Sequence, residues 1–330
     1  MTNMQPNTVA TEETLVEELA DPSVGQISNP TSKRLSRRQL LVRRFLRNRV
    51  AVGGLVVIAI LAVVAIVGPF VTHWKWDVID PKSYLKPPSM RHWLGTTQAG
   101  RDMLALTMRG MGKSLLVGFC VAILSTGIAA VLGSTAAYFG GWVQRIILWV
   151  IDLLLVIPSF LIIAILMSGG AAGLIGALHL TGANAWILLV FLLALFGWML
   201  SARVVRSLSM SVKEMEYVHA ARFMGLPARI IIARHILPNI SSLLVVDATL
   251  NVGGAILGET ALSYFGFGIQ SPEVSLGTLI SDGQQQLTTF PWLFAAPATV
   301  LVVLVLAVTA VGDGVRDAFD PSSGAGGSAK

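Results

Sequence analysis

The stretch VAVGGLVVIAILAVVAIVGPFVT, residues Val50–Thr72, decides the class of fold. No charged side chain interrupts it, and it exceeds the roughly 18 apolar residues that indicate a transmembrane helix. The whole chain agrees, because 54% of its residues are hydrophobic, only 13% are charged and the mean hydropathy is +0.71. A typical soluble domain has about 25% charged residues. The sequence therefore predicts a protein that crosses the membrane several times.

A dense basic block, KRLSRRQLLVRRFLRNR (33–49), lies directly before this run. Its position and partly amphipathic pattern predict a juxtamembrane helix on the cytoplasmic leaflet, in contact with anionic membrane lipid. Residues 1–32 are polar and mildly acidic, which predicts a disordered cytoplasmic tail. The net charge of +6 is explained by basic residues held on the cytoplasmic side, so we expect no nucleic-acid partner.

Five further apolar runs predict five more spans, at 114–139, 146–168, 185–201, 240–264 and 292–311. We therefore expect an all-α, six-span membrane protein. Its first extracytoplasmic loop would cover 73–113, its core would cover 114–320, and a flexible tail would follow at 321–330.

The distribution of Lys and Arg sets the orientation. The connector 169–183 and the loop 266–291 contain neither residue, whereas the loop 203–239 is rich in arginine. The positive-inside rule places both termini and the loop 203–239 in the cytoplasm. The loop 73–113 falls outside although it carries basic residues, because the rule counts long loops weakly.

The cytoplasmic loop contains a charged, helix-prone stretch, EYVHAARFMGLPARIIIARHILPN, Glu216–Asn239. Apolar residues recur at intervals of three and four, and Gly225 and Pro227 then break the pattern, which predicts two short helices that meet at a bend. The adjacent Ala220 and Ala221 let another backbone approach closely, as docking into a partner's groove requires. A helix that lies on the lipid surface is the alternative, and the residues alone leave it open.

Here the chain resembles the coupling-helix loop, or EAA loop, of permease subunits of binding-protein-dependent, ATP-driven importers. The resemblance is to their dipeptide, oligopeptide and nickel branch. Three more stretches match that branch in order: HWLGTTQAGRDMLALTMRGMGKSL (92–115), GETALSYFGFGIQSP (258–272) and GDGVRDAFDP (312–321). The resemblance covers Arg38–Pro321.

The resemblance implies the permease fold of type I importers of the ATP-binding-cassette (ABC) class, in the cytoplasmic (inner) membrane of a prokaryote. The chain would be one of two homologous permeases that form the pore. Its other partners would be one or two ABC ATPase subunits, which bind ATP and Mg²⁺, and an extracytoplasmic substrate-binding protein. This chain itself would hold no cofactor. Peptides are the favoured substrates over nickel or another small solute, because nothing in the sequence indicates metal handling.

The resemblance also implies which residues couple the permease to an ATPase: Glu216, Tyr217, Ala220, Ala221, Arg222 and Gly225. His219 stands where the family's tightest pattern has an acid, so Glu216, one turn upstream, is the nearest acid. Thr97 and Leu276 also replace residues that are common in the family.

Three acids fall within predicted spans, where an ionisable side chain is expensive unless it has a partner or faces a cavity. Asp152 follows Arg145 on the same helical face, which predicts an ion pair, with a place in the translocation path as the alternative. Glu259 is either a gate facing the pore or a hydrogen-bonded structural acid. Asp247 is interpreted as structural packing against the second permease.

Arg101 and Asp102 in the first outer loop are candidate contacts for the binding protein. The structural alternative is a local salt bridge and a cap on a helix that starts near Asp102. Pro158 predicts a kink in the third span.

The sequence offers no catalytic or metal site. GMGKS, Gly110–Ser114, ends like a phosphate-binding loop, but Thr107 replaces the first glycine that the pattern needs. The five histidines form no pair at metal-ligand spacing, and no nucleophile motif is present. An autonomous secondary transporter is the rival from another class, and it lacks the expected internal repeat.

Overall fold

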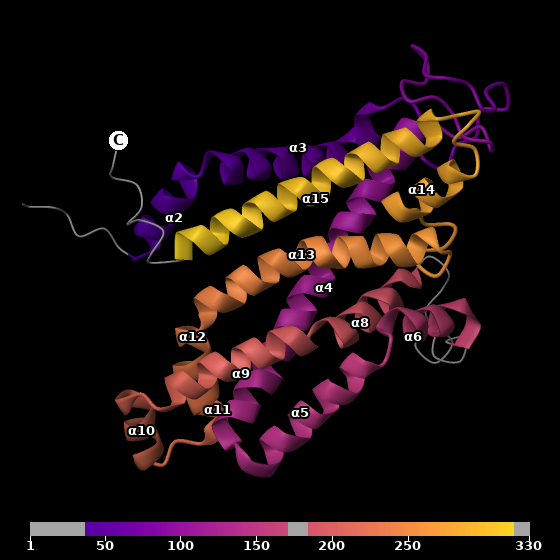
Figure 1. Ribbon diagram of the computed structural model, residues 1–330. Helices are drawn as coiled ribbons and strands as arrows, with labels where there is room; N and C mark the ends of the chain where they lie inside the picture. Colours follow the sequence, from indigo (N-terminus) through magenta and orange to yellow (C-terminus); the bar gives the residue numbers. More distant parts are fainter. Residues whose placement is uncertain (1–36, 171–183, 320–330) are drawn as a thin grey trace, which may run out of the picture. The chain divides into compact units, whose positions relative to one another are not determined.

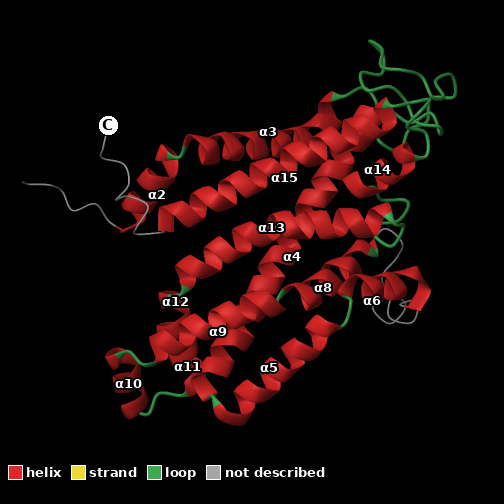
Figure 2. Ribbon diagram, viewed as in Figure 1, coloured by secondary structure: helices red, strands yellow, loops and turns green. Residues whose placement is uncertain are grey.

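The computed structural model describes residues 37–170 and 184–319 (Figure 1). The chain divides into two units, Met1–Leu40 and Leu41–Lys330, and only Arg37–Leu40 of the first is described. The expected tails, 1–32 and 321–330, and most of the connector 169–183 lie outside the described residues. Helices and loops make up the described part, which contains no strand beyond two isolated bridges (Figure 2).

Four helices are long and apolar enough to cross a membrane: α3 (Arg49–Val71), α4 (Met103–Phe139), α13 (Ser241–Tyr264) and α15 (Trp292–Phe319). Two bent pairs raise the number of spans in the described residues to as many as six. These pairs are α5 (Gly141–Val156) with α6 (Ser159–Ile165), and α8 (Trp186–Gly197) with α9 (Met199–Lys213). A short π-helix, η1 (Leu166–Gly170), continues α6, and α2 (Arg37–Arg47) precedes α3. The all-α prediction is confirmed.

The third predicted span, 146–168, is a broken helix rather than a kinked one. The axes of its two halves differ by 75°. Pro158 has no backbone N–H to donate and its ring disfavours helical geometry in the preceding residue. Ile157 accordingly adopts an extended conformation, with φ −79° and ψ 126°. The helix therefore stops before Pro158 and restarts after it.

The fourth span also differs from its predicted bounds, 185–201. Its helix bends by 46° next to Gly197 and Trp198 and then continues to Lys213. Glycine is a weak helix former, so the bend falls where the helix is easiest to distort. The second half carries the chain beyond the predicted end of the span toward the charged segment.

The second span begins earlier than expected, since α4 starts at Met103 and includes the last part of the predicted loop 73–113. Asp102 is the N-cap, and its side chain accepts a hydrogen bond from the backbone N–H of Ala105 at 2.8 Å. Such a cap satisfies one of the free N–H groups at a helix start.

Helix α4 is the central element of the Leu41–Lys330 unit. Helices α9 and α13 each pack along it, and α3 packs along α15 (Figure 1). Gly54 allows close approach in the second pair, because a Cβ there would lie 2.7 Å from the carbonyl oxygen of Ala307. The start of α4 packs with α14 (Leu276–Gln284) and its end packs with the segment after α9, so these two elements mark opposite ends of the helix bundle.

Candidate functional site

The charged segment forms a small folded unit, here called the connecting lobe, residues 214–239. It contains α10 (Glu216–Phe223), α11 (Ala228–Ile231), the π-helix η3 (Ile232–Ile236) and α12 (Leu237–Asn239). Helix α9 leads into it and α13 leads out of it (Figure 1). The predicted pair of short helices that meet at a bend is confirmed, since α10 ends before Gly225 and the helix from Ala228 runs on to Asn239.

The inner face of α10 is buried against the chain's own helices. Val218 and Ala221 are three residues apart and so lie on one helical face. They pack with Val205 and Val212 of α9 and with Ile231 and Ile236 of the lobe, all of them buried. The lobe and α9 thus share one small hydrophobic core.

This packing corrects the predicted docking face of small residues. Ala221 is 1% exposed and Ala220 is exposed, so the two alanines do not form one accessible surface. Helical periodicity is the physical reason, because adjacent residues point about 100° apart. Ala221 supports α10 from inside, and Ala220 lies on the outer side.

The outer face of α10 carries side chains that sequence reasoning did not select. Phe223 is 90% exposed and Met224 is 73% exposed, and Met215 and Tyr217 are also exposed. Glu216 and Arg222, which were selected, are exposed beside them. The sequence feature that could have indicated these residues is the Phe-Met pair at the end of a charged helix, outside the face that holds Val218 and Ala221.

Gly225 ends α10 in the left-handed conformation, with φ +76°. Glycine takes this conformation without the steric cost that a Cβ brings. We expect Gly225→Ala to destabilise the lobe by about 1 kcal/mol, although space is open around the new methyl group. Gly225→Asn should cost less, since asparagine tolerates this region. Protease sensitivity of the lobe in membranes measures the difference, and equal sensitivity of the alanine variant and the unchanged protein would contradict it.

Two side-chain contacts fix the lobe further. The amide of Asn239 donates to the hydroxyl of Tyr217, which ties α10 to α12, the last helix of the lobe. His219 lies 3.4 Å from the carboxylate of Glu214. Both Tyr217 and His219 therefore have partners inside the chain.

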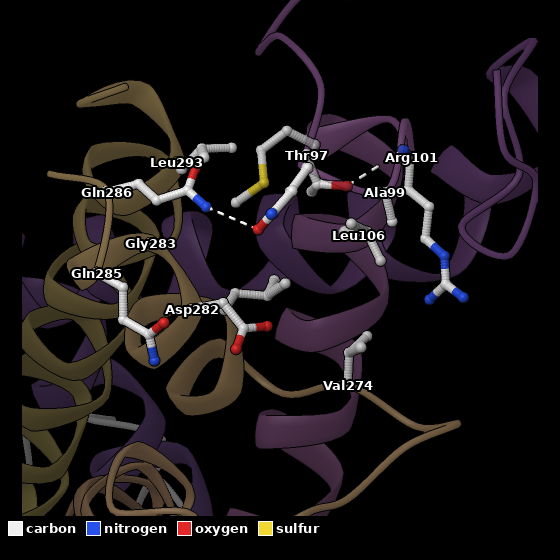
Figure 3. A pocket seen from close by; sticks show the side chains of 13 residues that line it. Thr97, Ala99, Arg101, Leu106, Val274, Asp282, Gly283, Gln285, Gln286 and Leu293 are labelled. Atoms are coloured by element: carbon white, nitrogen blue, oxygen red, sulfur yellow. Dashed lines mark hydrogen bonds between the residues drawn. The ribbon is translucent and has the colours of Figure 1, made fainter. Parts of the chain in front are cut away.

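A cavity of about 240 Å³ lies at the other end of the bundle, next to α14 (Figure 3). Arg101 and Asp282 are the charged residues that line it, and Figure 3 shows them on opposite sides of Leu106 and Val274. Neither forms an ion pair within the described residues. Burial raises the pKa of the Asp282 carboxyl above its ordinary value. The amides of Gln98 and Gln286 hydrogen-bond at 2.9 Å across the cavity.

Asp102, paired with Arg101 in the prediction, is not on this surface. It is buried, caps α4 and lies 2.9 Å from one ring nitrogen of His92, whose other nitrogen is 3.5 Å from Asp80. A backbone hydrogen bond from Lys82 lowers the pKa of Asp80. The capping alternative therefore describes Asp102, and the predicted local salt bridge with Arg101 does not form.

Asp152 has a different partner from the one expected. Its carboxylate pairs with Arg203 of α9 rather than with Arg145, whose guanidinium lies over the ring of Trp142, 5.4 Å from its centroid. The break before Pro158 and the bend at Trp198 arrange α5 and α9 so that Asp152 reaches across to the neighbouring helix.

Glu259 is fully buried, at 0% exposed, in the centre of a hydrogen-bond network. It accepts from the hydroxyls of Ser114 at 3.0 Å and Ser263 at 2.6 Å. Ser114 in turn accepts from the backbone N–H of Leu276, and Ser263 from that of Ile269. Glu259 thus joins α4 and α13 to the loop before α14. This geometry favours the structural alternative over the gate.

Asp247 is also satisfied inside the chain, and its predicted packing against a second permease stays a prediction. Its carboxylate accepts from Ser201 of α9 at 2.8 Å, Thr126 of α4 at 3.0 Å and Asn251 of α13 at 2.9 Å. Among the described residues, His, Cys, Asp and Glu form no group that suits a metal ion.

Comparison with known proteins decides the family. The model of the binding-protein-dependent transport system inner membrane component matches residues 129–324, and that of the N-terminal transmembrane domain of oligopeptide transport permease C matches 36–88. The chain belongs to this permease family. The oligopeptide transport system permease protein OppC of Mycobacterium tuberculosis (strain ATCC 25618 / H37Rv) is 51% identical over 87% of this chain and 96% of its own length. OppC of Bacillus subtilis (strain 168) is 32% identical over 92% and 96%.

The family resemblance inferred from four sequence motifs is thereby confirmed. Membership makes the chain a multi-pass inner-membrane subunit of an importer that has other subunits. The connecting lobe lies within the first of the two matched ranges, and α3 lies within the second.

Proposed function

We propose that this permease forms one half of the pathway of a peptide importer and moves peptides inward by alternating access. The single observation that carries the substrate class is the 51% identity to a permease named for oligopeptide transport, over nearly its full length. The exposed apolar outer face of α10 supports the mechanism, because it offers a partner the kind of aromatic and methionine anchors common at protein interfaces.

In this proposal both termini and the connecting lobe face the cytoplasm, where one or two ABC ATPase subunits bind α10. ATP and Mg²⁺ are held by those subunits, and this chain neither binds nor hydrolyses ATP. A second, homologous permease completes the pathway. The coupling contacts are Glu216, Tyr217, Ala220, Arg222 and Phe223, while Ala221 and Gly225 hold the helix in place.

The outer cavity is the proposed contact for the extracytoplasmic binding protein. Arg101 and Asp282 line it without an ion-pair partner in the described chain. An acidic and a basic side chain on a docked protein would therefore form ion pairs with them. This assignment keeps Arg101 as a contact and replaces Asp102 with Asp282.

Asp282→Asn is expected to weaken docking of the binding protein about tenfold, which corresponds to about 1.4 kcal/mol. The same change should not lower the thermal stability of the permease at neutral pH. The folded-state pKa of Asp282 is raised by burial, so its ionisation costs stability as the pH rises above the ordinary value of 3.8.

Titration of ATPase stimulation with the binding protein measures the docking. Asp313→Asn is the matched control, because Asp313 is an exposed acid near the opposite end of α15. Equal affinities for both variants would remove the cavity from the docking surface.

Mass spectrometry of the proteins that co-purify with the tagged chain from its native membrane, in mild detergent, tests the proposed assembly. The proposal requires a second six-span permease and one or two ATPases with nucleotide-binding motifs. A chain that purifies alone or as a homodimer, without an ATPase, would point to an autonomous transporter instead.

A further inference from the structure

The connecting lobe continues directly into two helices, here called its arms, α9 and α13, and it also packs on the end of α4. The lobe shares one buried cluster with α9, and Tyr217 and Asn239 tie its first helix to α12, which leads into α13. Both arms pack mainly against α4 (Figure 1). The same cluster includes Val205 of α9 and Leu244 of α13, so the arms are joined at the lobe. Moving them together farther into the helix bundle needs a second connection.

Asp247 supplies such a connection. It lies in the second turn of α13, and its carboxylate accepts one hydrogen bond from each of three helices, through Ser201, Thr126 and Asn251. The Asn251 amide also lies 3.3 Å from the Ser201 hydroxyl and 3.4 Å from that of Thr126. Ser201 and Thr126 are both buried. An ionisable group placed within a span is costly and commonly serves function.

The Asp247 cluster lies on one side of the bend in the fourth span, the side that leads to the lobe. Ser201 lies just beyond Trp198, on the half of the span that runs to the lobe. On the other half, next to Gly197, a cavity of about 210 Å³ is lined by α4, α6, α8 and α13. Asn251 and Gly254 line it from α13, and Ser125 lines it from α4. The fourth span is thus hydrogen-bonded to α13, and through Asp247 to α4, on the lobe side of the bend and borders a cavity on the other.

We propose that Asp247 is a positioning residue that clamps α9 to α13 and α4, so that displacement of α10 moves both arms as one body and the bend at Trp198 takes up the difference. The clamp adds to the proposed function and rests on it, because the displacement comes from ATPase subunits. A carboxylate suits this role, since its two oxygens accept from several helices at once.

The test uses the complete complex, reconstituted in proteoliposomes with its second permease, ATPases and binding protein. The measured quantity is the number of trialanine molecules imported per ATP hydrolysed. Asp247→Asn is expected to lower this ratio about tenfold in assembled complexes, because the amide turns one acceptor into a donor. Ser201→Ala should lower it several-fold, whereas Ser201→Thr, which keeps the hydroxyl, should not.

Asp313→Asn is the control for loss of one negative charge on a span, and it should leave the ratio unchanged. A residue with only a structural role would reduce the yield of complexes but not the ratio in those that remain. An unchanged ratio in Asp247→Asn overturns the clamp. If that variant does not assemble, Ser201→Ala decides, and an unchanged ratio there overturns it equally.

The unchanged complex separates this inference from the proposed function. Import of trialanine by that complex, together with unaltered coupling in Asp247→Asn, removes the clamp alone. If the unchanged complex neither imports trialanine nor hydrolyses ATP faster with loaded binding protein, the proposed function falls and the clamp falls with it.

Discussion

Replacing Phe223 with aspartate is expected to abolish ATP-driven peptide uptake while the chain still inserts and pairs with its second permease. Phe223 is 90% exposed, so the fold of the lobe does not depend on its ring. A docked ATPase would bury that ring, and a charge at the same place would have to be desolvated without a partner. Loss of an anchor of this kind costs at least about 2 kcal/mol, or roughly 30-fold in affinity.

Uptake by membrane vesicles and co-purification of the ATPase measure the two parts of this expectation. Phe223→Leu is the matched control, because it keeps an apolar side chain and should retain most activity. Ala221→Trp is a poor test of docking, since Ala221 is buried and a large side chain there would break the lobe's core. Normal uptake by Phe223→Asp would remove α10 from the coupling interface.

Replacing Glu259 with alanine is expected to prevent assembly of a stable complex. The change leaves the hydroxyls of Ser114 and Ser263 without their acceptor and opens a cavity where α4, α13 and the loop before α14 meet. Two hydrogen bonds to an acidic group and a void together should cost at least about 3 kcal/mol. The thermal unfolding midpoint in detergent measures the loss.

Glu259→Gln separates the structural interpretation from the gate. An amide oxygen can still accept one of the two hydroxyls, so this variant should assemble and transport with a modestly lower midpoint. A gate would give the opposite pattern, with both variants stable and transport lost or ungated. That result would restore Glu259 to the translocation path.

The spans were predictable because length and apolarity are local properties of the sequence. The start of α4 was indicated only by the possible cap at Asp102, because Arg109 and Lys113 lower the hydropathy of its first turns. Both find their partner in Glu273, at 2.7 and 3.4 Å, far along the chain. A charge pair between distant segments leaves no local signal, so apolarity alone starts the second span at 114.

The site was predictable in kind but not in detail. The charged stretch, its helical period and Gly225 indicated two short helices with a bend, and the family resemblance implied their coupling role. Pro158 indicated a disruption of the third span. Which alanine of the pair is buried depends on what α9 presents to α10, and this is fixed only by packing. No proline in the sequence marks the bend at Trp198. The partners of Asp247 come from three separate helices, so no local pattern indicates them.

Photocrosslinking from position 223 tests the central claim most directly. Phe223→p-benzoylphenylalanine, in native membranes, is expected to crosslink to an ATPase subunit that carries nucleotide-binding motifs. Phe70→p-benzoylphenylalanine is the control. Phe70 is 86% exposed at the C-terminal end of α3, away from the lobe, and it should crosslink to no ATPase. Crosslinks from position 223 to lipid alone would mean that α10 lies on the membrane surface, and they would contradict the account.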